Sequence, residues 1–264
     1  MGQLPRGAAR TLARSLYEAR ATRQPIAPLT DAEPGLGPLD GYAIQRELLS
    51  LLQADGERVS GYKAGLTSEP MQAMFGLDSP DYGPVLASTV HRSGSALSLK
   101  AFTAPRVEAE IACRLGADLT GPGITVQQAR RSITEVYASI EIVDSRIRDW
   151  RIRLADTIAD LASAGAVVIG DLPVPAAGLD LPGIAMHLRR GDEWIAAGKG
   201  SAALGDPAAV VAWLANTLGA LGVTLEAGHL VMTGALHAAV PMSAGDEFVA
   251  EFDVLGSVGM RVEP

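Results

Sequence analysis

The sequence predicts an α+β fold, with a helical N-terminal portion over residues 1–80 and a strand-rich portion over residues 81–264. Three observations support this prediction. Apolar residues recur at helical spacing near the N-terminus, whereas short alternating or β-branched runs dominate the rest of the chain. Those runs are not spaced as regular βαβ units, so a mixed or antiparallel sheet is expected. Hydrophobic residues make up 48% of the 264 residues, enough for a sizeable core.

Two amphipathic helices are predicted in the N-terminal portion. Leu12, Leu16 and Ala19 share one side of the segment 6–22, with arginines on the other side. A second helix is predicted over residues 41–52, after the helix-breaking sequence PGLGPLD. Proline and glycine then interrupt the chain between residues 60 and 90.

The C-terminal portion begins with the most regular strand signal. Residues 106–115 alternate strictly between apolar and polar or small side chains, as a half-buried strand does. Thr125 is a plausible N-cap for a helix over residues 125–138, and Asp206 followed by Pro207 opens another helix. Further strands are predicted over residues 139–144, 166–171, 229–234, 246–252 and 257–263.

Composition excludes several classes of function. The formal net charge is −8 at pH 7, so no basic surface for nucleic acid or for an anionic membrane is expected. One cysteine, Cys113, excludes a disulfide framework and a cysteine-based zinc module. The sequence begins without an apolar signal segment and contains no run long enough to cross a membrane, so a soluble, cytoplasmic protein is expected.

Three glutamates suggest a cation site. Side chains alternate along a strand, so Glu108 and Glu110 lie on the same face. That face either binds a cation or is simply exposed to solvent. Glu141 lies within the apolar run Ser139–Val143, which should be buried, and a buried carboxylate is costly unless it is compensated. Three carboxylates suit a hard divalent ion such as Mg²⁺ or Mn²⁺, whereas the four histidines are dispersed singly.

A collinear set of motifs extends this local pattern over residues 40–262. The motifs include GYKAGLTS at 61–68, PDYG at 80–83, RVEAEI at 106–111, EIVDSRI at 141–147, DTIAD at 156–160 and ALGDP at 203–207. Together they resemble the 2-oxopent-4-enoate hydratase and 4-oxalocrotonate decarboxylase family of the fumarylacetoacetate hydrolase superfamily.

The resemblance implies a distorted mixed β-roll as the catalytic domain over residues 81–264, and assembly into a homo-oligomer. It also implies that Glu108, Glu110 and Glu141 are ligands of Mg²⁺ or Mn²⁺. The substrate implied is a small 2-hydroxy-2,4-dienoate, to which the enzyme adds water to give a 4-hydroxy-2-oxo acid.

The resemblance further assigns roles to four polar residues. Lys63 would contact the substrate carboxylate or enol oxygen, although a lysine between glycines is more often an exposed loop residue. Asp81 would perform acid–base chemistry, although a turn aspartate explains the local sequence nearly as well. Ser163 and Thr233 would supply polar contacts in the pocket, and Ser163 is included with Lys63 and Asp81 among the catalytic candidates.

Other readings of the same motifs stay open. The sister activity is decarboxylation of 4-oxalocrotonate, whose enzymes tend to have I-[WY]-G where this chain has Asp81 within PDYG. The chain departs from the family at Leu161, at His237 and after Gly83, which leaves an unusual dienol or 2-oxo acid as a further candidate substrate. Hydrolysis of acylpyruvates is disfavoured, because those enzymes usually have an aspartate as third ligand and an upstream histidine. The non-enzymatic alternative is a metal-free scaffolding protein that associates with a sister decarboxylase.

Overall fold

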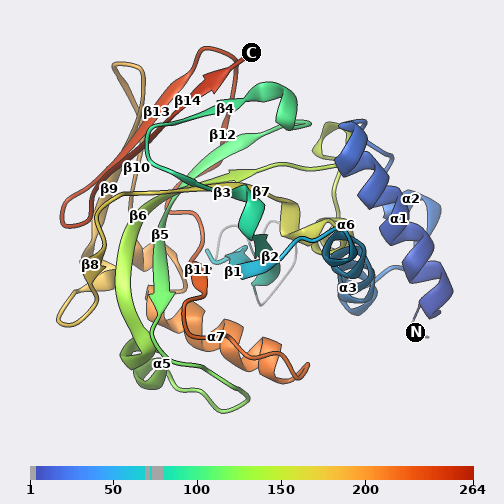
Figure 1. The fold of residues 1–264 in the computed structure, drawn as a ribbon, viewed down its shortest axis with the longest axis horizontal. Coiled ribbons are helices and arrows are strands. Elements are labelled where there is room, and N and C mark those ends of the chain that lie inside the picture. The colour runs from blue at the N-terminus through green and yellow to red at the C-terminus, as the bar shows by residue number, and fades with distance from the viewer. Residues whose placement is uncertain (1–3, 69–71, 73–79) are drawn as a thin grey trace.

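The computed structural model describes residues 4–68, 72 and 80–264, and within them helices flank two β-sheets (Figure 1). The helices are α1 Arg6–Thr22, α2 Leu29–Ala32, α3 Pro38–Ala54, α5 Val126–Ser132, α6 Leu154–Ala159 and α7 Pro207–Gly219. No helix in this described part is both long and apolar enough to cross a lipid bilayer.

The larger sheet has nine strands in the described residues. Its order is β2-β1-β11-β5-β6-β7-β3, with β12 paired to β5 and β8 paired to β6. Its strands are β1 Val59–Gly65, β2 Asp81–Leu86, β3 Val90–Arg92, β5 Arg106–Leu115, β6 Ile133–Val143, β7 Ala164–Ile169, β8 Val174–Pro175, β11 Leu230–Met232 and β12 Val240–Pro241. Parallel pairs (β1 with β11) and antiparallel pairs (β5 with β6) occur together, so the sheet is mixed.

The smaller sheet has five strands in the order β10-β9-β13-β14-β4. They are β4 Ser95–Ser98, β9 Ala185–Arg190, β10 Glu193–Lys199, β13 Glu247–Phe252 and β14 Gly256–Glu263. The main core joins the two sheets and α7: Ile111 and Ile140 of the larger sheet, Leu188 and Phe248 of the smaller one and Leu214 of α7 are all fully buried in one cluster. The predicted α+β fold with a mixed sheet is confirmed.

The N-terminal helices form a second, smaller core. Figure 1 shows α1, α3 and α6 together at one end of the molecule, away from β13 and β14. Leu16 of α1 and Ile44 and Leu48 of α3 pack there with Ile147, which follows β6, and with Leu161, which precedes β7. Gln45 is buried in the same region and donates to the carbonyls of Tyr82 (2.9 Å) and Ile158 (2.8 Å).

Most element predictions are confirmed, and one is wrong in its extent. The helix at 6–22 and the strand at 106–115 have the predicted bounds. The helix that Thr125 caps ends at Ser132 rather than at residue 138, because Ile133–Val143 pairs with both β5 and β7. Helical periodicity in this segment is overridden by β-branched residues that fill a central strand.

The segment between residues 60 and 90 contains β1 and β2, which belong to the larger sheet. Residues 69–71 and 73–79 of the proline- and glycine-interrupted stretch lie outside the described residues. The division of the chain at residue 80 stays a prediction.

The smaller core should contribute substantially to stability. Leu16→Ala deletes a side chain with no exposed surface, and such truncations cost about 2–5 kcal/mol. Leu39→Ala, at a helical position that is 73% exposed, should change the free energy of unfolding by less than about 0.5 kcal/mol. Denaturant titration of both variants measures the difference. Equal effects would contradict the packing described here.

Candidate metal centre

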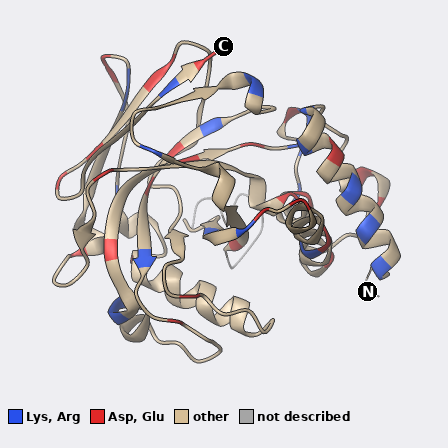
Figure 2. Cartoon of the chain, in the orientation of Figure 1, with Lys and Arg blue, Asp and Glu red and all other residues tan. Residues whose placement is uncertain are grey.

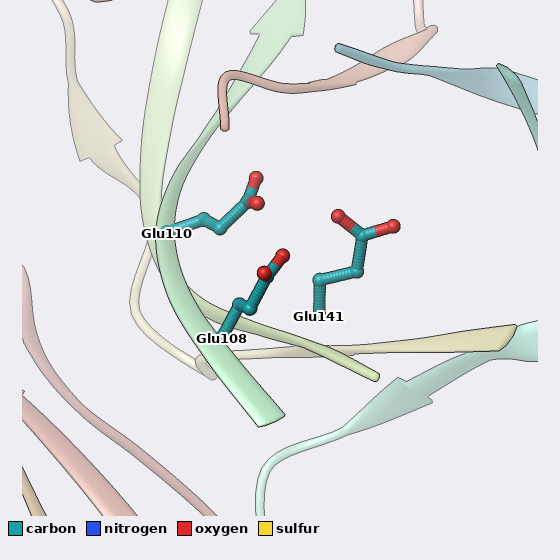
Figure 3. Close-up of side chains that lie close together, drawn as sticks. All are labelled: Glu108, Glu110 and Glu141. Carbon is teal, nitrogen blue, oxygen red and sulfur yellow. The ribbon is translucent and has the colours of Figure 1, made fainter. Parts of the chain in front are cut away.

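The pairing of β5 with β6 brings three glutamates together. Glu108 lies directly opposite Glu141 in the antiparallel register, and Glu110 follows two residues along the same face, opposite Ser139. One carboxylate oxygen from each glutamate lies within 4.8 Å of the other two. Figure 3 shows the three side chains pointing into one shared space.

The opposite face of β5 explains why the glutamates point this way. Val107, Ala109 and Ile111 are completely buried in the main core, so the alternation of the strand directs Glu108 and Glu110 to the other side. That side is not a solvated surface. Glu110 is 0% and Glu141 1% exposed, and only Glu108 is partly open.

Burial raises the pKa of all three carboxyl groups, and repulsion by Glu141 adds to the shift of Glu108 and Glu110. The pKa of Glu108 rises to about 7, first because burial disfavours its charged form and then because Glu141 faces it. The pKa of Glu110 is raised well above its usual range by burial and by Glu141. Burial also raises the pKa of Glu141, although nearby Lys63 opposes this shift.

Lys63 and Asp81 adjoin the glutamates from β1 and β2. The Lys63 ammonium lies 3.5 Å from Oε1 of Glu141 and donates a 3.0 Å hydrogen bond to the carbonyl of Ala162. Burial lowers the pKa of Lys63, but its attraction to Glu141 and Asp81 outweighs this, so the pKa is raised and the side chain is charged. Burial raises the pKa of Asp81, and Lys63 opposes that shift. Lys63 is 4% exposed, so the expectation of an ordinary loop lysine is excluded.

A glycine makes room for this pair. Gly65 lies opposite Asp81 in the β1–β2 register. A Cβ added at Gly65 would overlap Oδ1 of Asp81 and lie 3.3 Å from the Lys63 ammonium. Position 65 of the GYKAG segment must therefore be glycine, because a side chain there would displace Asp81 and crowd Lys63.

The carboxylates fit a divalent cation. Buried oxygens on three of these groups have no hydrogen-bond partner in the described structure: Oδ1 of Asp81, Oε1 of Glu110 and Oε2 of Glu141. Unpartnered buried acceptors are costly, and a hard cation compensates several of them at once. Among the described residues, the Lys63 ammonium is the one cation in ion-pair contact with any of these four acidic groups, so the excess negative charge also favours a cation.

A strained loop supplies the carbonyl that Lys63 contacts. Leu161, Ala162 and Ser163 have φ values of 56°, 51° and 57°, in the left-handed region. Such residues cost on the order of 1–3 kcal/mol each and persist only where the surrounding structure holds them. Here the loop begins at Asp160, whose carboxylate accepts hydrogen bonds from Nε of the buried Arg146 (2.6 Å) and from its backbone N–H (2.8 Å).

Ser163 and Thr233 do not contact the glutamates through the hydrogen bonds of the described structure. The Ser163 hydroxyl lies 3.2 Å from the Thr157 hydroxyl, and Thr233 donates to the carbonyl of Ile111 at 2.8 Å. Both side chains are buried, and their roles toward a substrate stay predictions.

Sequence reasoning missed several contacts that shape the site. The N–H of Gly234 donates to Oε2 of Glu110 at 2.9 Å. Nε2 of His237 accepts the N–H of Ala109, between the two glutamates of β5, at 2.8 Å. Backbone donors and a ring nitrogen leave no spacing signal in a sequence. Arg146 and Asp160 were detectable, because both lie within the motifs EIVDSRI and DTIAD.

Comparisons with known proteins agree with this geometry. The sequence model of a family described as "Fumarylacetoacetate (FAA) hydrolase C-terminal" matches residues 64–263. A 2-hydroxyhexa-2,4-dienoate hydratase from Comamonas testosteroni is 43% identical over 95% of this chain and 96% of its own length. A 2-keto-4-pentenoate hydratase from Burkholderia vietnamiensis is 43% identical over 94% of this chain and 95% of its own length.

A solved structure is similar over nearly the whole chain. The 4-oxalocrotonate decarboxylase from Pseudomonas putida, complexed with magnesium and adipate, superposes with a TM-score of 0.96. It is 30% identical, and the match covers 99% of this chain and 100% of the decarboxylase.

Cation binding should be visible as thermal stabilisation. A ligand that binds only the folded state at about 100 times its Kd adds roughly 2.7 kcal/mol, so Mg²⁺ or Mn²⁺ should raise the melting temperature measurably. Glu108→Gln removes one proposed ligand and should abolish most of this rise. The exposed Glu247→Gln on β13 is the matched control and should keep it. An unchanged rise in Glu108→Gln would exclude that glutamate as a ligand.

The raised pKa values predict how the metal-free protein responds to pH. The pKa of Glu108 is raised from 4.5 to about 7, so the folded chain binds more protons than the unfolded chain between these values. Stability should therefore fall as the pH rises through this window. We expect the melting temperature of metal-free protein to decrease from pH 5 to pH 7.5, and to decrease less in Glu108→Gln. Identical pH profiles for the two proteins would refute the assignment of this loss to the glutamate cluster.

Proposed function

The chain belongs to the family of 2-hydroxydienoate hydratases and 4-oxalocrotonate decarboxylases within the fumarylacetoacetate hydrolase superfamily, and on that premise we propose that it is a divalent-metal-dependent hydratase. The reaction adds water to a 2-hydroxy-2,4-dienoate and yields a 4-hydroxy-2-oxo acid. The hydratase relatives support this choice, because their sequence identity to the chain is higher than that of the decarboxylase.

The proposed ligands are Glu108, Glu110 and Glu141, and the proposed cation is Mg²⁺ or Mn²⁺. Their shared space and their unpartnered oxygens support this assignment. When bound, the cation would supply Lewis acidity that stabilises negative charge on the substrate's carboxylate and 2-oxygen.

Lys63 binds and orients the substrate. Its ammonium has three donors, of which one is used by the Ala162 carbonyl and another faces Glu141. The remaining donor is available to the carboxylate or the 2-oxygen of the substrate. Because Lys63 is buried and its position is fixed by the Ala162 carbonyl, little rotamer freedom is lost when substrate binds.

Asp81 holds and moves the proton. Its Oδ1 has no hydrogen-bond partner and its pKa is raised by burial, which favours the protonated form more than in water. We assign Oδ1 as the atom that delivers a proton to C5 while the 2-hydroxyl loses its proton, which gives an α,β-unsaturated 2-oxo acid. The same oxygen, now deprotonated, can accept a proton from the water that attacks C4, which returns Asp81 to its starting state. C3 takes up a proton from solvent last, and this proton balances the one that the 2-hydroxyl released to solvent.

Decarboxylation is the second candidate, because the decarboxylase superposes on this chain over nearly its whole length. The same carboxylate cluster and lysine would stabilise the enolate that remains after CO₂ leaves. The difference between the two reactions therefore lies in whether a group is positioned to handle water and carbon protonation, and Asp81 is the residue on which the hydratase assignment depends.

The cellular setting follows from the same resemblance. We propose a cytoplasmic homo-oligomer that associates with a sister decarboxylase of its pathway. Trp194 on the edge strand β10 is 55% exposed, which is consistent with an interface that covers it.

A product assay tests the proposed function. The enzyme with Mg²⁺ should convert 2-hydroxypenta-2,4-dienoate to 4-hydroxy-2-oxopentanoate, should lose this activity after chelation, and should release no CO₂ from 4-oxalocrotonate. Asp81→Asn should lower kcat by about 10²–10⁴-fold while the Mg²⁺-dependent thermal shift is kept. Asp192→Asn, in an exposed turn, is the control and should be fully active. Release of CO₂ from 4-oxalocrotonate would assign the chain to the decarboxylase branch instead.

A further inference from the structure

A separate cavity of about 320 Å³ lies on the other face of the larger sheet from the glutamates. Its wall includes Ala166, which pairs with Ile142, whereas Glu141 pairs with the next residue of β7 and points to the opposite side. Three arginines line this space, and we call it the arginine cavity: Arg20 and Arg23 at the end of α1, and Arg146 after β6. Figure 2 shows the basic residues (blue) along α1 at this end of the molecule.

Two of these guanidinium groups converge on one acceptor. Nη1 of Arg20 and Nη1 of Arg146 both donate to the carbonyl oxygen of Ala164, at 3.2 Å and 3.3 Å. Two like charges held against a single neutral acceptor repel each other, so the arrangement needs a negative charge nearby.

Among the described residues, the nearby carboxylates form ion pairs with Arg146 and not with Arg20. Asp160 lies 2.6 Å from its Nε and Asp144 lies 3.5 Å from its Nη1. Asp144 is further occupied by the backbone N–H groups of residues 103 and 104. In the described part of the chain, no carboxylate lies within ion-pair distance (4.0 Å) of Arg20 or Arg23.

The environment of Arg20 reflects this imbalance. Its pKa is lowered to about 10, first by burial and then by the charge of Arg146, and the more distant charges of Asp160 and Asp144 only partly oppose this shift. Besides Asp144, one further acidic side chain lines the cavity: Glu57, which accepts a 2.6 Å hydrogen bond from the Ser88 hydroxyl. Ser88 and Thr89 add hydroxyl groups to the wall, and Phe102 adds an apolar surface.

We propose that the arginine cavity binds a small oxyanion, a carboxylate or a phosphate, between the guanidinium groups of Arg20 and Arg23. Guanidinium groups match both anions with paired hydrogen bonds. The volume is at the lower end of ligand sites, so the ligand is a small molecule rather than a nucleotide or a peptide. The site is distinct from the glutamate cluster and does not depend on the proposed hydratase activity.

Calorimetric titration of metal-free protein tests this proposal, with inorganic phosphate and succinate as separate probes. Metal is removed by dialysis against chelator and then buffer, so that neither anion is recruited by a cation at the glutamates. We expect saturable binding of at least one probe, weakened by added NaCl. Arg20→Gln should reduce the affinity about tenfold or more.

The control is Arg10→Gln, which removes the same charge from an exposed position of α1 about three helical turns away and should leave the affinity unchanged. If Arg20→Gln fails to fold, the exposed Arg23→Gln decides the question and should also weaken binding. The proposal is overturned if neither probe binds saturably, if the cavity variants that fold bind as tightly as the unaltered protein, or if Arg10→Gln weakens binding equally. The probe that binds more tightly identifies the ligand as a carboxylate or a phosphate.

Discussion

The register between β5 and β6 is the constraint on which the site depends. It places Glu108 opposite Glu141 and leaves Glu110 two residues further along the same face. A slip of one residue would turn both glutamates of β5 into the main core and bring Val107 and Ala109 to the site. The register is therefore secured by the hydrophobic effect, because the apolar residues that alternate with the glutamates along β5 are fully buried on the other face. The same burial raises the free energy of the charged glutamates, so the stability of the sheet and the demand for a compensating cation have one physical origin.

The surroundings of the cluster are arranged to hold charge in place. Lys63 is the cation that the chain itself provides, and its position relies on the carbonyl of Ala162. That carbonyl is presented by three consecutive left-handed residues, a conformation that persists where the surrounding structure holds it, and Asp160 and the buried Arg146 hold the start of this loop. Arg146 thus connects two regions of the molecule. Its Nε contacts the carboxylate of Asp160 before the strained loop, and the same residue lines the arginine cavity. A buried ion pair of this kind is costly to desolvate, and here its benefit is the geometry of the loop.

Hydration and decarboxylation of related 2-oxo acids share their electrostatic requirement, which is stabilisation of an enolate. This explains how relatives named for a hydratase and a decarboxylase can both resemble one chain closely. Enolate stabilisation requires a cation site and a positive side chain, and this chain presents the glutamate cluster and Lys63 from one sheet. In the mechanism that we propose, the outcome of the reaction is then decided by proton transfer, which depends on single groups such as Asp81 rather than on the fold.

The sequence by itself determined the local structure and much of the site. Alternation in residues 106–115 fixed the strand and the face of Glu108 and Glu110, and the apolar run around Glu141 indicated a buried carboxylate, because both are properties of short-range periodicity. The motifs were sufficient to identify the family, and the family pattern in turn singled out Lys63 and Asp81 as candidate site residues. Only the tertiary structure decided which residues meet: that Glu141 faces Glu108, that Gly65 must lack a side chain, and that residues 133–138 extend a strand rather than a helix. Those outcomes depend on pairing between strands far apart in the chain, and the arginine cavity likewise joins α1 to the end of β6. The contact energies that decide them come from residues distant in sequence, so no local pattern contains them.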